Sequence, residues 1–222
     1  MISFTISGNI PANATITNVQ LTLTVGQVPN PGFNGNSTIS LYDVTQSWPQ
    51  GTTGSASAGI AATGQGFAAN PGDATWNDVS YSATLPTLWT TAGGDHSGTA
   101  SASLSLSNFN LTGNPSFTWS SAQLVADVQN WLANPSSNFG WELINSNETT
   151  ASTLFGFYSS EWDNAHFGGS STQVPVLQVT YTTPIPEPGA GSLCAMAALV
   201  ALGLRPRPRR GAPRGSGVPW LG

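Results

Sequence analysis

Apolar and polar residues alternate along several short stretches of the chain. The clearest stretch is TITNVQLTLTV, residues 15–25, in which Val19, Leu21, Leu23 and Val25 recur at every second position. A period of two is that of a strand with one buried face. The same reasoning, extended to short aromatic and β-branched runs between turn residues, predicts strands over residues 37–45, 74–81, 87–91, 101–107, 139–145, 153–160 and 174–181.

One segment has the period of a helix instead. Residues 120–134 place apolar side chains at positions i, i+1, i+4, i+7 and i+8, namely Leu124, Val125, Val128, Trp131 and Leu132. These positions share one helical face. Ser120 or Ser121 can cap the start, and Asn134-Pro135 ends the helix. Many short strands with a single amphipathic helix predict an all-β fold, an antiparallel β-sandwich or jelly roll with the helix over one end or edge.

The charged residues are unevenly distributed. All ten acids lie at or before Glu187, and all five basic residues are arginines behind residue 204. Residues 1–204 therefore carry a formal charge of −10 and residues 205–222 one of +5, which sum to −5. A body without cationic side chains cannot neutralise phosphates, so nucleic acid is excluded as a partner. Acidic polysaccharides are disfavoured for the same reason, unless a bound cation bridges.

The chain changes character at Thr183-Pro184, where a proline-rich linker begins. We therefore divide it into a body, residues 1–182, and a tail, residues 183–222. The tail contains an apolar run of 16 residues, 189–204, followed by arginines. Such a run is short for a bilayer-spanning helix, which needs about 20 residues, and the arginines would stay on the cytoplasmic side. A hydrophobic C-terminal helix is thus expected, either as a sorting signal or as a plain membrane anchor.

The tail resembles a PEP-CTERM sorting signal. The residues that carry the resemblance are Pro186, Glu187, Pro188, Arg205, Arg207, Arg209 and Arg210. It implies that the intramembrane enzyme exosortase recognises the tripeptide and removes the tail, after a transient stay in the inner membrane through residues 189–204. It also implies that the protein ends at the cell surface or in the extracellular matrix of a Gram-negative bacterium. Residues 211–222 extend past the point where the family usually stops.

The body resembles a DNRLRE-type domain, a group counted among carbohydrate-binding modules. The matching pieces are ISFTISGNIPANATITNVQLTLTV, ISLYDVTQSW, ATWND, the helix with the following SSNFGWEL, the short FYSSE at 157–161, and PVLQVTY. The resemblance implies a jelly-roll-like sandwich that binds extracellular polysaccharide. Where the family often carries an arginine after Phe157, this chain has Ser159-Ser160-Glu161. We therefore expect neutral glycan binding, or a structural role without a sugar site.

Aromatic side chains are the candidate sugar contacts, because sugar rings stack on flat aromatic faces. Trp89, Tyr158 and Trp162 lie in or beside loop-rich segments and are the glycan-stacking candidates. Packing is the competing role for each of them. The remaining tryptophans of the body have strand or helix patterns that predict core positions, namely Trp48, Trp76, Trp119, Trp131 and Trp141.

Two further patterns can carry chemistry. Glu161, Asp163 and Asn164 supply oxygens for a structural Ca²⁺, although a solvated acidic turn explains the same pattern. Asp95-His96-Ser97 has the residue types of a catalytic triad, but its flanking glycines favour a turn. No motif selects two carboxylates for glycoside cleavage. We therefore expect no enzymatic activity and no cofactor, with a structural or adhesive matrix protein as the alternative and a glycan-cleaving enzyme as the weakest one.

The first residues, MISFTIS, have neither the basic start nor the apolar core of a signal peptide. They have the pattern of a strand interior instead. We therefore expect a signal peptide, and a further strand, upstream of Met1 in the exported protein.

Overall fold

The computed structural model describes residues 1–27, 35–51, 68–107, 113–160 and 172–184. Contacts divide the chain into two units, Met1–Thr183 and Pro184–Gly222, and the description below concerns the first. Among the described residues, no helix is both long and apolar enough to cross a bilayer. The apolar run 189–204 and the arginines behind it lie outside these residues.

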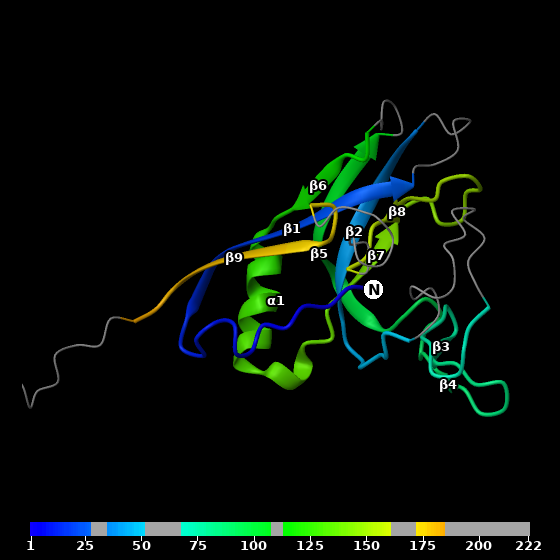
Figure 1. The fold of residues 1–222 in the computed structure, drawn as a ribbon, viewed down its shortest axis with the longest axis horizontal. Helices are drawn as coiled ribbons and strands as arrows, with labels where there is room; N and C mark the ends of the chain where they lie inside the picture. Colours follow the sequence, from blue (N-terminus) through cyan, green and yellow to red (C-terminus); the bar gives the residue numbers. More distant parts are fainter. Residues whose placement is uncertain (28–34, 52–67, 108–112, 161–171, 185–222) are drawn as a thin grey trace, which may run out of the picture. The chain divides into compact units, whose positions relative to one another are not determined.

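The described body consists mostly of strands in antiparallel sheets, with one α-helix, an architecture consistent with a β-sandwich (Figure 1). In the first sheet β1 pairs with three strands, β6, β8 and β9. In the second sheet β2 lies between β5 and β7, and β3 and β4 form a separate small hairpin. The bounds are β1 Thr15–Gln27, β2 Asn36–Val44, β3 Asp78–Ser80, β4 Thr87–Leu88, β5 His96–Ser107, β6 Ser116–Trp119, α1 Ala122–Ala133, a 3-10 turn Pro135–Ser137, β7 Trp141–Asn145, β8 Gly156–Phe157 and β9 Val176–Thr182.

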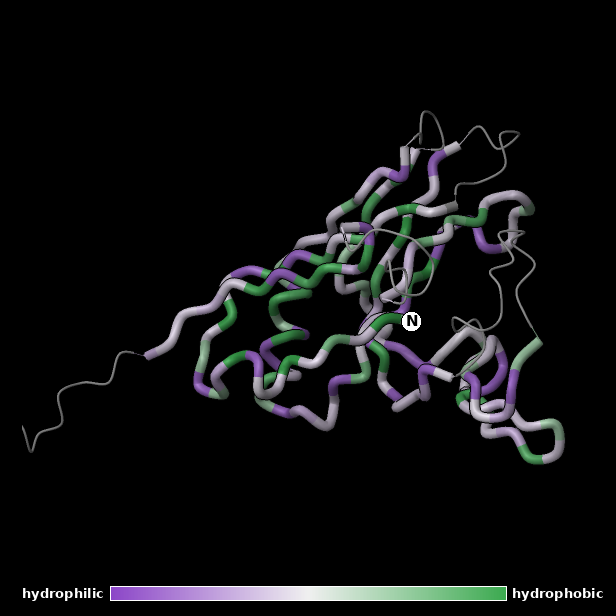
Figure 2. Tube along the Cα trace, in the orientation of Figure 1, coloured by the Kyte–Doolittle hydropathy of each residue, from purple (hydrophilic) through white to green (hydrophobic). Residues whose placement is uncertain are grey.

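Strand β1 has the single buried face that its alternating sequence predicts, and it is the central strand of its sheet. Val19, Leu21 and Leu23 are buried, and in Figure 2 hydrophobic and hydrophilic positions alternate along this strand. On the other face, the Thr22 hydroxyl bonds that of Thr118 on β6 at 2.8 Å. The short strand β6 was not predicted, because its four residues include only one fully buried apolar side chain.

Helix α1 confirms the predicted limits and cap. The Ser121 hydroxyl accepts a hydrogen bond from the Leu124 amide at 3.0 Å, and the chain leaves the helix at Asn134, before Pro135. The predicted apolar face packs into the core, where full burial of a Leu or Val side chain contributes about 1.5–3 kcal/mol. The helix contacts β1 and β5, so it closes the space between strands of the two sheets.

Three tryptophans form the centre of the core. Trp119, Trp131 and Trp141 are all fully buried, as their patterns predict. The rings of Trp131 and Trp141 lie 4.4 Å apart between centroids, and the Trp119 indole N–H donates to the Ile39 carbonyl at 2.9 Å. The first contact joins α1 to β7, and the second joins β6 of one sheet to β2 of the other.

Candidate functional site

Trp89 is buried in the β3–β4 hairpin region and is not a surface aromatic. Only 5% of its surface is exposed. Its indole N–H donates to the Thr75 carbonyl at 2.9 Å, and its backbone N–H donates to the Asn77 carbonyl at 3.1 Å. An indole enclosed in this way offers no face to a sugar, so Trp89 is removed from the stacking candidates and is a packing residue.

Trp76 also differs from its prediction, in the opposite direction: it is exposed rather than buried. The pattern of residues 74–81 predicts a core position for it, but 60% of its surface is exposed. The reason is a tight turn in front of β3, in which the Thr75 hydroxyl donates to the Asp78 carboxylate at 2.7 Å and accepts from the Asp78 amide at 3.0 Å. This turn directs the intervening Trp76 away from the hairpin interior. The pattern Thr-x-x-Asp was the available sequence signal for such a turn.

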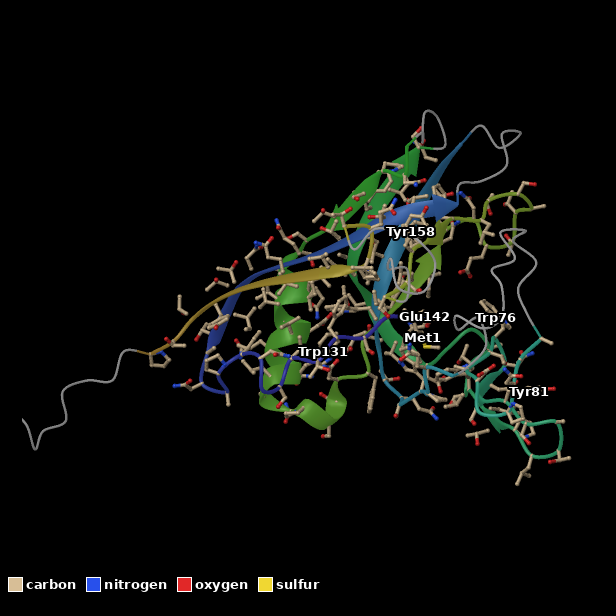
Figure 3. The ribbon with its side chains drawn as sticks, viewed as in Figure 1. Met1, Trp76, Tyr81, Trp131, Glu142 and Tyr158 are labelled. Atoms are coloured by element: carbon tan, nitrogen blue, oxygen red, sulfur yellow. The ribbon has the colours of Figure 1, made fainter. Side chains whose placement is uncertain are left out.

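The exposed indole is nevertheless supported from one side. A side chain added at Gly93 would begin 3.0 Å from the Trp76 ring, so the glycine backbone lies directly against it. Gly93 has φ +104°, and its amide donates to the Trp76 carbonyl at 2.6 Å. The ring therefore has one contact face on the protein and presents other surface to solvent. Figure 3 labels Trp76 beside the β3–β4 hairpin.

Trp76 lines a groove of about 650 Å³, called the Trp76 groove below. The other apolar lining residues come from β2, β7, β8 and the loop before β8, namely Ile39, Leu143, Leu154, Phe155 and Phe157. The polar lining residues come from β7 and the same loop, namely Asn145, Glu148, Thr150, Ser152 and Thr153. Leu154 is half-exposed, so the groove presents apolar surface beside hydrogen-bonding groups. This composition is typical of small-ligand sites.

Hydrogen bonds fix the loop that forms one wall of this groove. The Asn145 side chain donates to the Thr153 carbonyl at 2.9 Å and accepts from the Asn147 amide at 2.9 Å. The Thr153 hydroxyl lies within 2.9 Å of the Asn147 carbonyl and 2.8 Å of the Thr150 carbonyl. The wall is therefore held by its own side chains before any ligand binds, which lowers the entropic cost of binding.

Tyr158 lines a second groove, of about 630 Å³, together with Trp48 and Phe139. The tyrosine is half-buried, and its ring packs so closely on Gly26 that an added Cβ there would lie 2.7 Å from it. The Trp48 indole N–H donates to the Phe139 carbonyl at 2.7 Å. Both aromatics thus take part in packing. The third stacking candidate, Trp162, lies outside the described residues, as do the calcium candidates Glu161, Asp163 and Asn164.

The turn predicted at Asp95-His96-Ser97 is only partly right: it ends at Asp95, because His96 and Ser97 are the first two residues of strand β5. The Asp95 carboxylate accepts hydrogen bonds from the Thr90 and Thr91 amides, both at 3.0 Å, and the bond from Thr90 holds the pKa of Asp95 below its usual value. The His96 ring lies against Tyr42, with its Nδ1 2.7 Å from the Ser97 carbonyl. The Ser97 hydroxyl donates to the Thr99 carbonyl at 2.8 Å. These contacts join the three side chains to the backbone and to Tyr42 rather than to one another as a triad.

Two carboxylates enter the tryptophan core. Both oxygens of Asp127 accept hydrogen bonds, one from the Trp141 indole at 2.9 Å and one from the Gln123 amide group at 3.0 Å. Asp43 accepts from the Trp131 indole at 3.2 Å. Burial, followed by the nearby charge of Asp127, raises the pKa of Asp43 to about 6. Sequence analysis did not single out either residue, because nothing local shows that an acid will meet a tryptophan of another element.

Glu142 on β7 is also a buried carboxylate. One of its oxygens has no hydrogen-bond partner, and burial raises its pKa above the usual value. It lies under Gly94, where an added side chain would begin 2.6 Å from that oxygen. In the part of the chain that the structure describes, no group of three His, Cys, Asp or Glu side chains is arranged to hold a metal ion.

Comparisons with known proteins give no family model, no curated protein and no solved structure that matches this chain.

Proposed function

We propose that this chain is an exported, non-catalytic glycan-binding protein whose binding site is the Trp76 groove. The observation that carries the proposal is the Trp76 indole, which is 60% exposed and supported by Gly93 at the edge of a formed groove. An exposed tryptophan leaves much apolar surface in water, a cost that a stacked sugar ring would relieve. The adjacent Asn, Thr and Ser side chains suit the hydroxyls of the same sugar.

A binding role fits this groove better than catalysis. Glycoside hydrolysis uses a pair of carboxyl groups about 5–9.5 Å apart. Among the described residues that line the Trp76 groove, Glu148 is the single carboxylate. Asp43 and Asp127, which do interact, bind indole N–H groups in the core and line neither groove. The proposed protein therefore holds a glycan without cleaving it.

The finer identity of the body and the route of export belong to the same proposal. The body is a DNRLRE-type jelly roll, supported by the antiparallel sheets and by the helix that follows β6. The tail is an exosortase substrate, supported by Pro186-Glu187-Pro188, the apolar run and the arginines in that order. Its destination is the cell surface or the matrix outside a Gram-negative cell, where extracellular polysaccharide is the available ligand.

Binding is tested with the full chain on an array of neutral and charged oligosaccharides, followed by calorimetry on the glycans that bind. Trp76→Ala should weaken binding about 5- to 150-fold, if a sugar ring gains from the indole the roughly 1–3 kcal/mol that a nucleic-acid base gains by stacking on an aromatic side chain. The matched control is Leu85→Ala, which removes an 84% exposed side chain that lines neither groove. If no glycan binds, a matrix protein without a sugar site replaces the proposal. If both variants bind as the native chain does, the sugar site lies elsewhere and the Trp76 groove is ruled out.

Sorting is tested by intact mass and cell fractionation in a host with exosortase and in an exosortase-null strain, using the chain behind a working signal peptide. The expected product lacks the segment after Pro188, appears outside the cell, and forms only when the enzyme is present. An uncut chain in the inner membrane of both strains would make the tail a plain anchor and remove the main support for a matrix role.

A further inference from the structure

Building on the proposed function, we infer that the Trp76 groove selects glycans with free amino groups, that is, glucosamine-type sugars in their ammonium form. The proposal rests on two side chains that line the same groove, the exposed indole of Trp76 and the carboxylate of Glu148. An aromatic face and a carboxylate around one space are the pair of groups that recognise an organic ammonium.

The indole supplies the first interaction. Tryptophan has the strongest cation–π attraction of the aromatic side chains, effective within about 6 Å of the ring centroid. Gly93 supports the ring on one side, and the ring lines the groove with solvent-exposed surface. An amino sugar can therefore stack its ring on the indole and place its ammonium group near the same π-system.

The carboxylate supplies the second interaction. Glu148 is exposed, and one of its oxygens accepts a long hydrogen bond, 3.4 Å, from the Asn145 amide. The described residues contain no lysine or arginine, because all five arginines lie behind residue 204. An ammonium ligand would thus meet this carboxylate without displacing a Lys or Arg of the described body.

The formal charge of the body is compatible with a cationic ligand. Residues 1–204 carry −10, and the described residues contain neither Lys nor Arg, so the body as a whole repels uronates and attracts cations. Around Glu142, however, His96 and the Met1 ammonium affect the pKa more than Glu148 does. The selectivity proposed for the groove therefore depends on Glu148 itself and on Trp76, which both line it.

A matched set of ligands tests this inference on the full chain. Three β-1,4-linked hexamers differ only at the second carbon of each sugar, namely glucosamine hexamer, N-acetylglucosamine hexamer and cellohexaose. Calorimetry at mildly acidic pH, where the amines are protonated, should give glucosamine hexamer about tenfold tighter binding than the other two. The preference should decrease as salt is raised, because the groove is open to solvent.

Two variants separate the contributions. Glu148→Gln keeps the size of an exposed side chain and should weaken glucosamine hexamer about three- to fivefold while leaving cellohexaose unchanged. Trp76→Ala keeps every charge of the chain and should weaken all three hexamers. Circular dichroism and thermal unfolding of both variants show whether the fold is retained.

The outcomes distinguish this inference from the function on which it rests. Equal binding of the three hexamers, or an amine preference that Glu148→Gln leaves intact, would overturn the selectivity while keeping a glycan site. Native-like binding of glucosamine hexamer by Trp76→Ala would show non-specific attraction to the acidic body and would also overturn it. Absence of binding to any hexamer and to the broader glycan array would remove both the inference and the proposed function.

Discussion

Replacing Asp43 by Asn should stabilise the protein at neutral pH. The Asp43 carboxyl is half-buried beside Asp127, and its hydrogen-bond donor is the neutral indole of Trp131. Asparagine keeps an oxygen for the Trp131 indole N–H. It removes the charge that burial and Asp127 disfavour. The substitution therefore preserves the contact and deletes the unfavourable charge.

The size of the effect follows from the raised pKa. The pKa of Asp43 rises from 3.8 to about 6, a difference that corresponds to about 3 kcal/mol at full effect. Because the side chain is partly exposed, solvent screening reduces this to roughly 1–1.5 kcal/mol. The folded state binds the proton more tightly than the unfolded state. The stabilisation that the folded state gains by binding this proton at Asp43 is therefore complete below pH 3.8 and is lost as the pH rises through about 6.

The assay is urea unfolding of the full chain, followed by circular dichroism, at a series of pH values from about 4 to 8. The variant should gain about 1 kcal/mol over the native chain near pH 7, and the two should converge toward pH 4. A variant that is less stable at pH 7, or a difference that does not change with pH, would refute the reasoning.

Asp127→Asn is the matched control. Both oxygens of Asp127 accept hydrogen bonds from donors, the Trp141 indole and the Gln123 amide group. An asparagine amide would place a donor against one of these donors, so this variant should lose about 1–3 kcal/mol. If Asp43→Asn raises the free energy of unfolding and Asp127→Asn lowers it, the hydrogen-bond partners of each carboxylate decide the effect. Removal of a negative charge alone would then not explain the result.

Two further substitutions test the local structure. Ser121→Ala removes the hydroxyl that caps α1 and should cost about 1 kcal/mol, seen as a lower urea midpoint with an unchanged slope; an unchanged midpoint would show that the cap contributes nothing. Gly94→Ala places a side chain 2.6 Å from the Glu142 oxygen at φ +134° and should cost about 2 kcal/mol, whereas Gly98→Ala, with nothing within 4 Å, should be nearly neutral in the same thermal unfolding experiment. Equal melting temperatures for the two glycine variants would contradict the crowding at Gly94.

Elements with a strong period were predictable from sequence. Strand β1 and helix α1 were predictable because each repeats its apolar residues often enough to define one buried face. Strand β6 was missed because a strand of four residues, with Trp119 as its one fully buried side chain, has no detectable period. The helix cap was predictable because it depends on neighbours within one turn, and Ser121 fulfils it.

The candidate site was less predictable, and the two tryptophans near β3 and β4 show why. Trp89 was a sugar candidate and is buried; Trp76 was a core candidate and is exposed. A strand of three residues gives too little alternation to tell its two faces apart. The turn between Thr75 and Asp78 reversed the assignment. Glu148 and Leu154 had no distinguishing motif, because their role depends on the groove they share with Trp76.

The sequence by itself determined the β-rich class, the limits of the helix and the sign of the body's charge, since each follows from residue types and short-range periodicity. Tertiary structure alone decided which tryptophan faces solvent, which loop meets it across the Trp76 groove, and which acid acquires a raised pKa. Those properties depend on atoms brought together from distant parts of the chain. Asp43 meets Trp131 across 88 positions of sequence, a contact that no local pattern encodes.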